Sequence, residues 1–289
     1  MRAEQLTRAL SGRWHGQYGA ARCPAHDDRN PSLSIRDGEA GALLLYCFTG
    51  CQYRDIRAAL KFKLGDGAIN VSRTAWAVPN PKSAAAANAE LASRIWAQTV
   101  PIPESHAEAY LRQRRITCAL PDTLRFHPAL RHPTGRRLPV MVARVETVDD
   151  KLCAIHRTYL DSHAPRKTGR EPAKAMLGSC RGGAVRLSEG RTGLVVCEGI
   201  ETGLSLCDAM EGYSVWAALS TSGVVALRLP KPKQFGRNLL IACDGDAAGR
   251  KSGQTLAERS ARSGWAVELV SAPNGQDFND LARAGGGHV

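Results

Sequence analysis

The stretch NLLIACDGDAAGRKSG, residues 238–253, joins an apolar run to an acidic turn and then to a helical pattern. A short, continuously apolar run is typical of a strand that is buried on both faces of a sheet. The acidic turn Asp244-Gly245-Asp246 follows that run directly. In parallel α/β sheets, ligands bind at the carboxyl ends of the strands. The stretch therefore predicts a parallel sheet with a ligand site where this strand ends.

The two carboxylates of the turn have two interpretations. Asp244 and Asp246 are separated by one residue, so that they project the same way from extended backbone. They repel each other unless a cation lies between them, and Mg²⁺ prefers carboxylate and phosphate oxygens. Asp246 is also well placed to cap the following helix, since Asp is a common N-cap residue. A cap does not require Asp244, which favours a metal site without excluding the cap.

Other short apolar runs repeat this pattern in the last hundred residues. They cover residues 194–197, 215–219, 239–243 and 267–270, and helices are predicted between them over residues 201–211 and 247–263. Buried strands that alternate with helices predict a parallel sheet with helices on both faces.

Acidic residues follow two more of these strands. In the run LVVCEGIETGLSL the predicted strand ends at Glu198 and Gly199, and a helix that carries Glu201 follows. Asp277 and Asp280 follow the last strand. Carboxylates at neighbouring strand ends can meet at one edge of a sheet, so we expect Glu198 beside the Asp pair. Glu201, Asp277 and Asp280 are weaker candidates for a second cation.

The segments CEGIETGLS and IACDGDAAGRK together resemble the Toprim domain, which is shared by bacterial-type primases, topoisomerases and some nucleases. The resemblance implies a Rossmann-like sheet. It also implies that Glu198 acts in acid–base chemistry or metal binding, and that Asp244 and Asp246 hold Mg²⁺ or Mn²⁺. Two-metal sites of this kind stabilise the attacking and leaving oxygens of a phosphoryl transfer.

A second constellation lies near the N-terminus. Two residues separate Cys23 from His26, and three separate Cys47 from Cys51. Three Cys and one His in two close pairs match a closed structural Zn²⁺ site, although a chance arrangement is the alternative. Two short strands are predicted between the two ligand pairs, over residues 32–36 and 43–47, and the second of them ends at Cys47. Helices are predicted near residues 3–12 and 55–61.

The stretches ARCPAHDDRNPSLSI and LYCFTGC resemble the N-terminal zinc module of phage and plasmid primases. In that family the module helps to engage single-stranded template DNA, which implies charge and stacking from exposed side chains. A solvated surface is the alternative for each of them. The candidates are Arg22, Arg29, Arg36, Phe48 and Tyr53.

The middle of the chain is rich in basic residues. Strands are predicted over residues 138–146 and 152–160, after a helix near 104–113. The segments IHRTYLD and KAMLG resemble the region that precedes Toprim in phage and plasmid primases, where basic residues contact nucleotide phosphates. The resemblance favours Arg157 and Lys174 for this role, because Arg grips phosphate bidentately and Lys acts as a point charge. A solvated basic face is the alternative.

These observations predict an α/β chain in four parts: a zinc module at residues 1–64, a linker at 65–88, a basic α+β middle region at 89–188 and a Toprim domain at 189–289. A helix is expected to begin near residue 84. Such a chain resembles a phage or plasmid primase, which implies synthesis of short RNA primers on single-stranded DNA from NTPs. A Toprim nuclease and a catalytically idle DNA-binding accessory protein are the alternatives.

Composition is consistent with a nucleic-acid partner. The 289 residues carry a formal net charge of +12, which favours a polyanionic partner. No apolar run approaches the length of a membrane span and no signal peptide is recognisable, so we expect a cytoplasmic protein without a membrane partner. The sequence contains no phosphate-binding loop of the helicase type, so we expect strand unwinding to come from a separate helicase.

Overall fold

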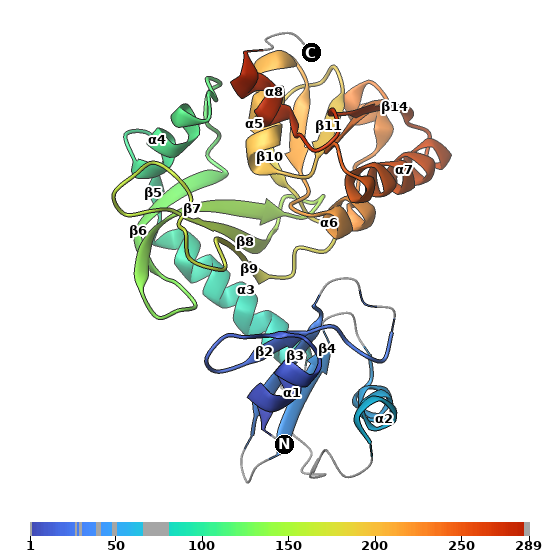
Figure 1. The fold of residues 1–289 in the computed structure, drawn as a ribbon. Coiled ribbons are helices and arrows are strands. Elements are labelled where there is room, and N and C mark those ends of the chain that lie inside the picture. The colour runs from blue at the N-terminus through green and yellow to red at the C-terminus, as the bar shows by residue number, and fades with distance from the viewer. Residues whose placement is uncertain are drawn as a thin grey trace. The chain divides into compact units, whose positions relative to one another are not determined.

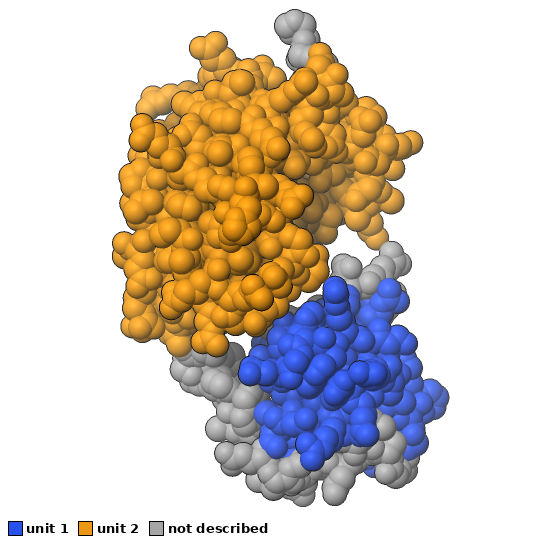
Figure 2. All heavy atoms as spheres, turned by 60° about the vertical axis from the view of Figure 1, so that its left-hand side comes forward, with its two compact units in different colours: residues 1–80 blue, residues 81–289 orange. Residues whose placement is uncertain are grey.

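The structure is a computed structural model that describes residues 2–26, 28, 31–38, 42–47, 51–65 and 81–285. The chain divides into two compact units, residues 1–80 and residues 81–289 (Figure 2). Within the described ranges, no helix is long and apolar enough to cross a membrane. We describe each unit by itself.

Unit 1 is a four-stranded antiparallel sheet in the order β1-β2-β3-β4 with two helices. Its elements are α1 (Ala3–Ala9), β1 (Arg13–Trp14), β2 (Gly19–Ala21), β3 (Leu33–Asp37), β4 (Leu43–Cys47) and α2 (Tyr53–Leu64). Leu6, Ile35 and Leu60 are fully buried in one apolar core, which fixes α1 and α2 against the sheet. The predicted strands are confirmed as β3 and β4, which pair Leu33 with Cys47.

Unit 2 begins with a helix and an antiparallel sheet in the order β5-β6-β7-β8-β9. The elements are α3 (Pro81–Ala97), β5 (Val100–Pro101), α4 (His106–Gln113), β6 (Leu124–Arg131), β7 (Arg137–Glu146), β8 (Leu152–Tyr159) and β9 (Lys174–Gly178). The predicted strands 138–146 and 152–160 are confirmed as β7 and β8. α3 begins at Pro81, so residues 81–88 of the expected linker are helical; proline is well tolerated at the first position of a helix. Residues 66–80 of that linker lie outside the described residues.

Alternating residues of β7 face two different cores. Val140 and Val142 pack in the core that contains Ile95 of α3, whereas Met141 and Ala143 belong to a core on the other side of the sheet. This alternation follows from the two-residue period of a strand. One face of the antiparallel sheet is therefore covered by α3, and the other face turns toward the second half of the unit (Figure 1).

The second half is a five-stranded sheet in the order β10-β12-β11-β13-β14. Its elements are β10 (Val185–Ser188), β11 (Leu194–Cys197), α5 (Ile200–Ala209), β12 (Ser214–Ala217), α6 (Thr221–Ala226), η2 (Pro232–Phe235), β13 (Asn238–Cys243), α7 (Ala247–Arg262), β14 (Ala266–Ser271) and α8 (Phe278–Ala284). The last four strands in this order are parallel, and β10 is antiparallel to β12. The predicted α/β fold with a parallel sheet is thus confirmed.

Helices cover both faces of this sheet, as the buried strands predicted. Val195 and Cys197 of β11 lie in one core with Leu204 of α5 and with α8, and Leu194 and Val196 lie in another with α6 and α7 (Figure 1). The α5 core is continuous with the core on the inner face of the antiparallel sheet. The two sheets of unit 2 therefore share one interior.

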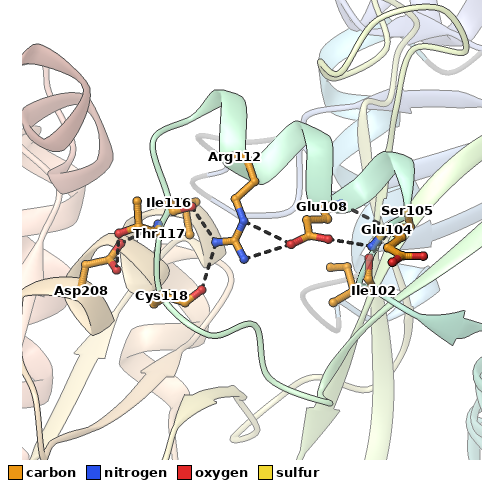
Figure 3. A network of polar contacts seen from close by, with 9 residues as sticks. All are labelled: Ile102, Glu104, Ser105, Glu108, Arg112, Ile116, Thr117, Cys118 and Asp208. Atoms are coloured by element: carbon orange, nitrogen blue, oxygen red, sulfur yellow. Dashed lines mark hydrogen bonds and ion pairs between the residues drawn. The ribbon is translucent and has the colours of Figure 1, made fainter.

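Polar contacts connect α4 to the segment that follows it and that segment to α5 (Figure 3). Arg112 of α4 pairs with Glu108 and donates to the carbonyls of Ile116 and Cys118 at 2.9 and 3.0 Å. The backbone N–H and hydroxyl of Thr117 donate to the carboxylate of Asp208 at the end of α5. These contacts fix α4 relative to the parallel sheet.

Candidate metal and nucleotide site

The acids of the first two motifs lie at the carboxyl ends of adjacent strands. β11 and β13 are parallel neighbours, and their register pairs Cys197 with Ala242. Glu198 leaves β11 one residue after this pair, and Asp244 leaves β13 two residues after it. The sheet topology therefore brings Glu198 to the edge that carries the Asp pair.

Gly245 brings the third acidic cluster to the same edge. Its N–H donates to the carbonyl of Gln276 and its carbonyl accepts from Gly275, both at 2.9 Å. A Cβ at this position would lie 1.8 Å from the carbonyl oxygen of Pro273, so only glycine permits this approach. The loop that leads into Asp277 is thereby held against the acidic turn.

Two of the acids also cap helices, and a third takes part in one of these caps. One carboxylate oxygen of Asp246 accepts the N–H of Gly249 at 2.6 Å, which makes Asp246 the N-cap of α7. Asp277 and Asp280 form a reciprocal capping box at the start of α8. The cap interpretation of Asp246 is therefore confirmed, and the second carboxylate oxygen of this residue is not part of that cap. A ligand role for Asp277 and Asp280 stays a prediction.

The site concentrates negative charge in partly buried surroundings. Burial, followed by the charges of Asp277, Asp246 and Asp280, raises the pKa of Asp244 to about 6, against the opposing effect of Lys174. Burial and the charges of the Asp pair raise the pKa of Glu198 to about 6 as well. Like charges at this spacing favour a cation between them.

The donor set fits a hard divalent cation. Oδ1 of Asp244 is buried and has no hydrogen-bond partner among the described residues, which leaves a carboxylate lone pair for a ligand. Within those residues, the acids do not form a compact group of three ligand atoms like that of the cysteines described below. Mg²⁺ commonly keeps several waters and takes one or two carboxylates together with phosphate oxygens, so it does not need such a compact group.

The two basic candidates lie on opposite faces of the antiparallel sheet. Lys174 pairs with Thr158 and Ala175 pairs with Arg157. Arg157 donates to the carbonyl of Met176 at 3.0 Å and lies over the ring of Tyr159, on the face that packs against α3. Lys174 is on the inner face, where its charge lowers the pKa of both Glu198 and Asp244. We call the strand ends that carry Glu198, Asp244 and Asp246 the acidic edge. The structure thus brings Lys174, and not Arg157, to this acidic edge.

Further residues that sequence analysis did not assign lie beside Lys174. Lys167 forms an ion pair with Glu201, and Tyr110 donates a hydrogen bond to the same carboxylate. His156 of β8 is buried on the same face of the antiparallel sheet as Lys174. No local pattern could have identified Tyr110 or Lys167, because they lie far from Glu201 in sequence and meet it only through the tertiary fold.

The predicted zinc ligands form a compact group in unit 1. One ligand atom from each of Cys23, His26, Cys47 and Cys51 lies within 4.8 Å of all the others. Burial, with a contribution from the neighbouring thiols, raises the pKa of Cys23 to about 12, so its thiolate needs a compensating cation. Three Cys and one His that converge in this way are one of the donor sets of a closed, tetrahedral Zn²⁺ site.

Asp28 supports the zinc group and was not identified from the sequence. Its carboxylate accepts hydrogen bonds from the N–H of Cys23 at 2.6 Å and from the hydroxyl of Ser32 at 2.6 Å. It also lies 3.6 Å from Nε2 of His26, whose Nδ1 faces Cys51 at 3.1 Å. A carboxylate on the outer nitrogen of a ligand histidine fixes the orientation of the ring. The adjacency of His26 and an acidic run was the available signal.

The proposed contacts of unit 1 with DNA are only partly covered by the structure. Tyr53 is 41% exposed, and Arg36 lies over the ring of Tyr18 at 5.3 Å. Arg29 and Phe48 lie outside the described residues.

Comparison with known protein families agrees with this division of unit 2. Residues 86–187 match a domain family of unknown function, and residues 193–288 match the Toprim domain. The chain thus carries a Toprim domain, and Glu198, Asp244 and Asp246 lie at the strand ends of that domain. No curated protein matches the sequence.

Among solved structures, the chain is similar to bacterial primases at low identity. A DNA primase domain from Pseudomonas aeruginosa is 18% identical, with 69% of this chain and 73% of that chain covered and a TM-score of 0.40. The Aquifex aeolicus primase, with its zinc-binding and RNA polymerase domains, is 13% identical, with 97% and 79% covered and a TM-score of 0.41. The RNA polymerase domain of the Mycobacterium tuberculosis primase is 15% identical, with 69% and 78% covered and a TM-score of 0.40.

Proposed function

We propose that this chain is a DNA primase that synthesises short RNA primers on single-stranded DNA by metal-dependent nucleotidyl transfer. The observation that carries the proposal is the acidic edge of the Toprim domain, where Glu198 and the Asp pair follow adjacent strands and Lys174 pairs with Glu201 at the start of α5. This edge combines carboxylates for a divalent cation with an ammonium group for phosphate.

The reaction needs a 3′-hydroxyl to attack the α-phosphorus of an incoming NTP and pyrophosphate to leave. Asp244, through its unpaired Oδ1, and Asp246, through the carboxylate oxygen that its cap leaves available, would hold Mg²⁺ or Mn²⁺. When bound, the divalent cation supplies charge neutralisation at the transferring phosphoryl group. Glu198 binds the cation or accepts the proton of the attacking hydroxyl, and its raised pKa suits proton transfer near neutral pH.

Unit 1 supports a nucleic-acid partner for this reaction. Its Cys3His set fits a structural Zn²⁺, which would hold a small unit that has a limited core of its own. We assign to this unit a contact with the single-stranded template. The net charge of +12 favours the same partner. A separate helicase would supply the single strand.

Primer synthesis on a random single-stranded template tests the proposal. The wild type should incorporate labelled NTPs into short oligoribonucleotides in the presence of Mg²⁺ or Mn²⁺. Asp244→Asn should lower the yield by at least about a hundredfold, since it removes one charged metal ligand. Glu268→Gln is the matched control, because Glu268 is an exposed acid on β14 of the same sheet. No product from the wild type would refute the proposal.

Two other outcomes would point to other functions. Cleavage of labelled plasmid with Mn²⁺ and without NTPs, lost in Asp244→Asn, would identify a nuclease. DNA binding without either reaction, unchanged in Asp244→Asn, would identify an accessory protein.

A further inference from the structure

Glu201 is an almost completely buried carboxylate at the start of α5. Its relative exposure is 4%. Oε1 accepts the hydroxyl of Tyr110 at 2.7 Å and lies 2.8 Å from Nζ of Lys167, and Oε2 lies 3.3 Å from Nζ of Lys174. A buried charge persists only where it is paired and hydrogen-bonded, and both oxygens of Glu201 meet this condition.

These partners disfavour a metal ion at Glu201. Sequence analysis predicted Glu201 as a candidate ligand of a second cation. In the structure, each of its three partners is a donor, and two of them are positively charged. A divalent cation at the same oxygens would face two ammonium groups at short range. The carboxylate is therefore already neutralised by the protein itself.

The two lysines are less buried than the carboxylate that they share. The side chains of Lys167 and Lys174 are 30% and 40% exposed, whereas that of Glu201 is 5% exposed. Two ammonium groups with one carboxylate leave a net charge of one positive unit. Lys174 pairs with Glu201 in the first turn of α5, three residues after Glu198, so this charge borders the acidic edge. A positive group beside metal-binding carboxylates fits the phosphates of a metal-bound nucleotide.

The position of Glu201 is fixed from two sides. Its backbone belongs to α5, whose far end is bound through Asp208 to Thr117 (Figure 3). Tyr110 reaches it from α4, which Arg112 connects to the same segment. The carboxylate therefore cannot move toward the acidic edge without breaking contacts on both helices.

We propose that Glu201 is a positioning residue that fixes Lys167 and Lys174 beside the acidic edge, where the two lysines bind the triphosphate of the incoming nucleotide. It does not bind the catalytic cation. The identity of the bound nucleotide as the substrate rests on the proposed function, whereas the arrangement of the three side chains does not.

Two binding measurements test this assignment without requiring primer synthesis. The first is the affinity for ATP with Mg²⁺, measured by calorimetry. The second is the affinity for Mn²⁺ alone on the zinc-loaded protein, measured by electron paramagnetic resonance. The variants are Glu201→Gln and the double variant Glu201→Gln/Lys167→Met. The double variant keeps the net charge of the network. It is included because Glu201→Gln alone leaves two lysines without a carboxylate, and their repulsion could unfold the protein.

Both variants should bind ATP about tenfold more weakly than wild type, the order expected when a charged hydrogen-bond network loses one partner. The double variant should bind Mn²⁺ as wild type does. Glu268→Gln is the matched control, because Glu268 is an exposed acid on β14 outside this network. It should leave the ATP affinity and the Mn²⁺ affinity unchanged.

A fall in Mn²⁺ affinity of the double variant to the level of Asp244→Asn would show that Glu201 is a metal ligand and would overturn the assignment. So would wild-type ATP affinity in both Glu201 variants, or a wild-type protein that binds no ATP. A wild type that binds ATP as described but makes no primer would overturn the proposed function instead and leave the assignment in place.

Discussion

At the scale of single residues, the acidic edge and the adjoining start of α5 combine two kinds of carboxylate: those available to a cation, Asp244 and Glu198, and one that is paired with lysines, Glu201. Asp244 and Glu198 are partly buried with a raised pKa, and Glu201 is held charged by its lysine partners, with its pKa well below the ordinary value. His156 lies next to the same lysines and has no hydrogen-bond partner for Nδ1 among the described residues. Burial, followed by Lys174, lowers its pKa to about 4.

The buried His156 predicts a specific pH dependence of stability. In the unfolded chain it takes up a proton near its ordinary pKa of 6.5, whereas the folded protein resists protonation down to about 4. Its effect on the free energy of unfolding is therefore absent above pH 6.5, and stability falls as the pH decreases from 6.5 to 4. Linkage over this interval gives a loss of about 3 kcal/mol.

His156→Gln should remove this part of the pH dependence of the free energy of unfolding, because glutamine does not titrate. Urea unfolding between pH 4 and 7 should show the variant losing about 3 kcal/mol less than wild type over that range. Parallel pH profiles for the two proteins would contradict the buried, neutral state of His156.

At the scale of elements, helix α7 begins at a residue with two roles: Asp246 caps the helix and is also a proposed metal ligand. The helix packs closely on β13: a Cβ on Gly253 would lie 2.1 Å from Sγ of Cys243. The start of α7 is therefore fixed at the end of the strand, and its N-cap is also a member of the acidic pair.

Two substitutions separate these roles. Asp246→Ala should lower the free energy of unfolding by about 1 kcal/mol through loss of the cap, whereas Asp246→Ser should keep most of the stability because serine caps well. Both should abolish primer synthesis, since neither retains the carboxylate. Thermal unfolding and primer assays on the same preparations provide the comparison. Full activity in Asp246→Ser would mean that the residue acts only as a cap.

The elements that sequence predicted best are those with a strong local pattern. β7, β8, β11 and β13 are long or continuously apolar runs, and α7 follows an acidic cap. β1, β2, β5, β6, β9 and β10 were not predicted, because they are short, polar or half-buried and are stabilised by their neighbours in a sheet. The capping box of α8 was present as Asp277 and Asp280, but the sequence pattern alone favoured a cation site there.

The same limit applies to the candidate site. The acids of the edge follow their strands directly, so topology could be used to predict that Glu198 and Asp244 meet. Arg157 and Lys174 lie on opposite faces because the register of β8 and β9 pairs Arg157 with Ala175 and not with Lys174. A change of register by one residue would reverse the face of every side chain on a strand, and the sequence does not show the register. The pairing of Glu201 with Lys167 and Tyr110 depends on contacts between segments that are distant in sequence.

At the scale of the whole molecule, the chain consists of two units whose stability has different origins. Unit 2 has a shared interior between two sheets, whereas unit 1 has a small core that includes Cys23 and Cys47 themselves. Metal binding by such a unit contributes directly to its folding.

Removal of zinc should therefore unfold unit 1 and leave unit 2 intact. After chelation, amide hydrogen exchange should rise across residues 2–65 and stay unchanged across 81–285. Cys47→Ser should show the same pattern without chelator, and Cys153→Ser, outside the ligand set, is the control. Slow exchange in unit 1 after the metal is removed would contradict a structural role for zinc.

Anomalous diffraction from crystals of the protein grown with Mn²⁺ would show whether a divalent cation binds at the acidic edge of the Toprim domain through Asp244 and Asp246. We expect a manganese peak within coordination distance of these two carboxylates, next to Glu198, and none at Glu201. A fully ordered acidic edge without a peak, or a peak bound by Glu201 instead, would contradict a cation site at the Asp pair.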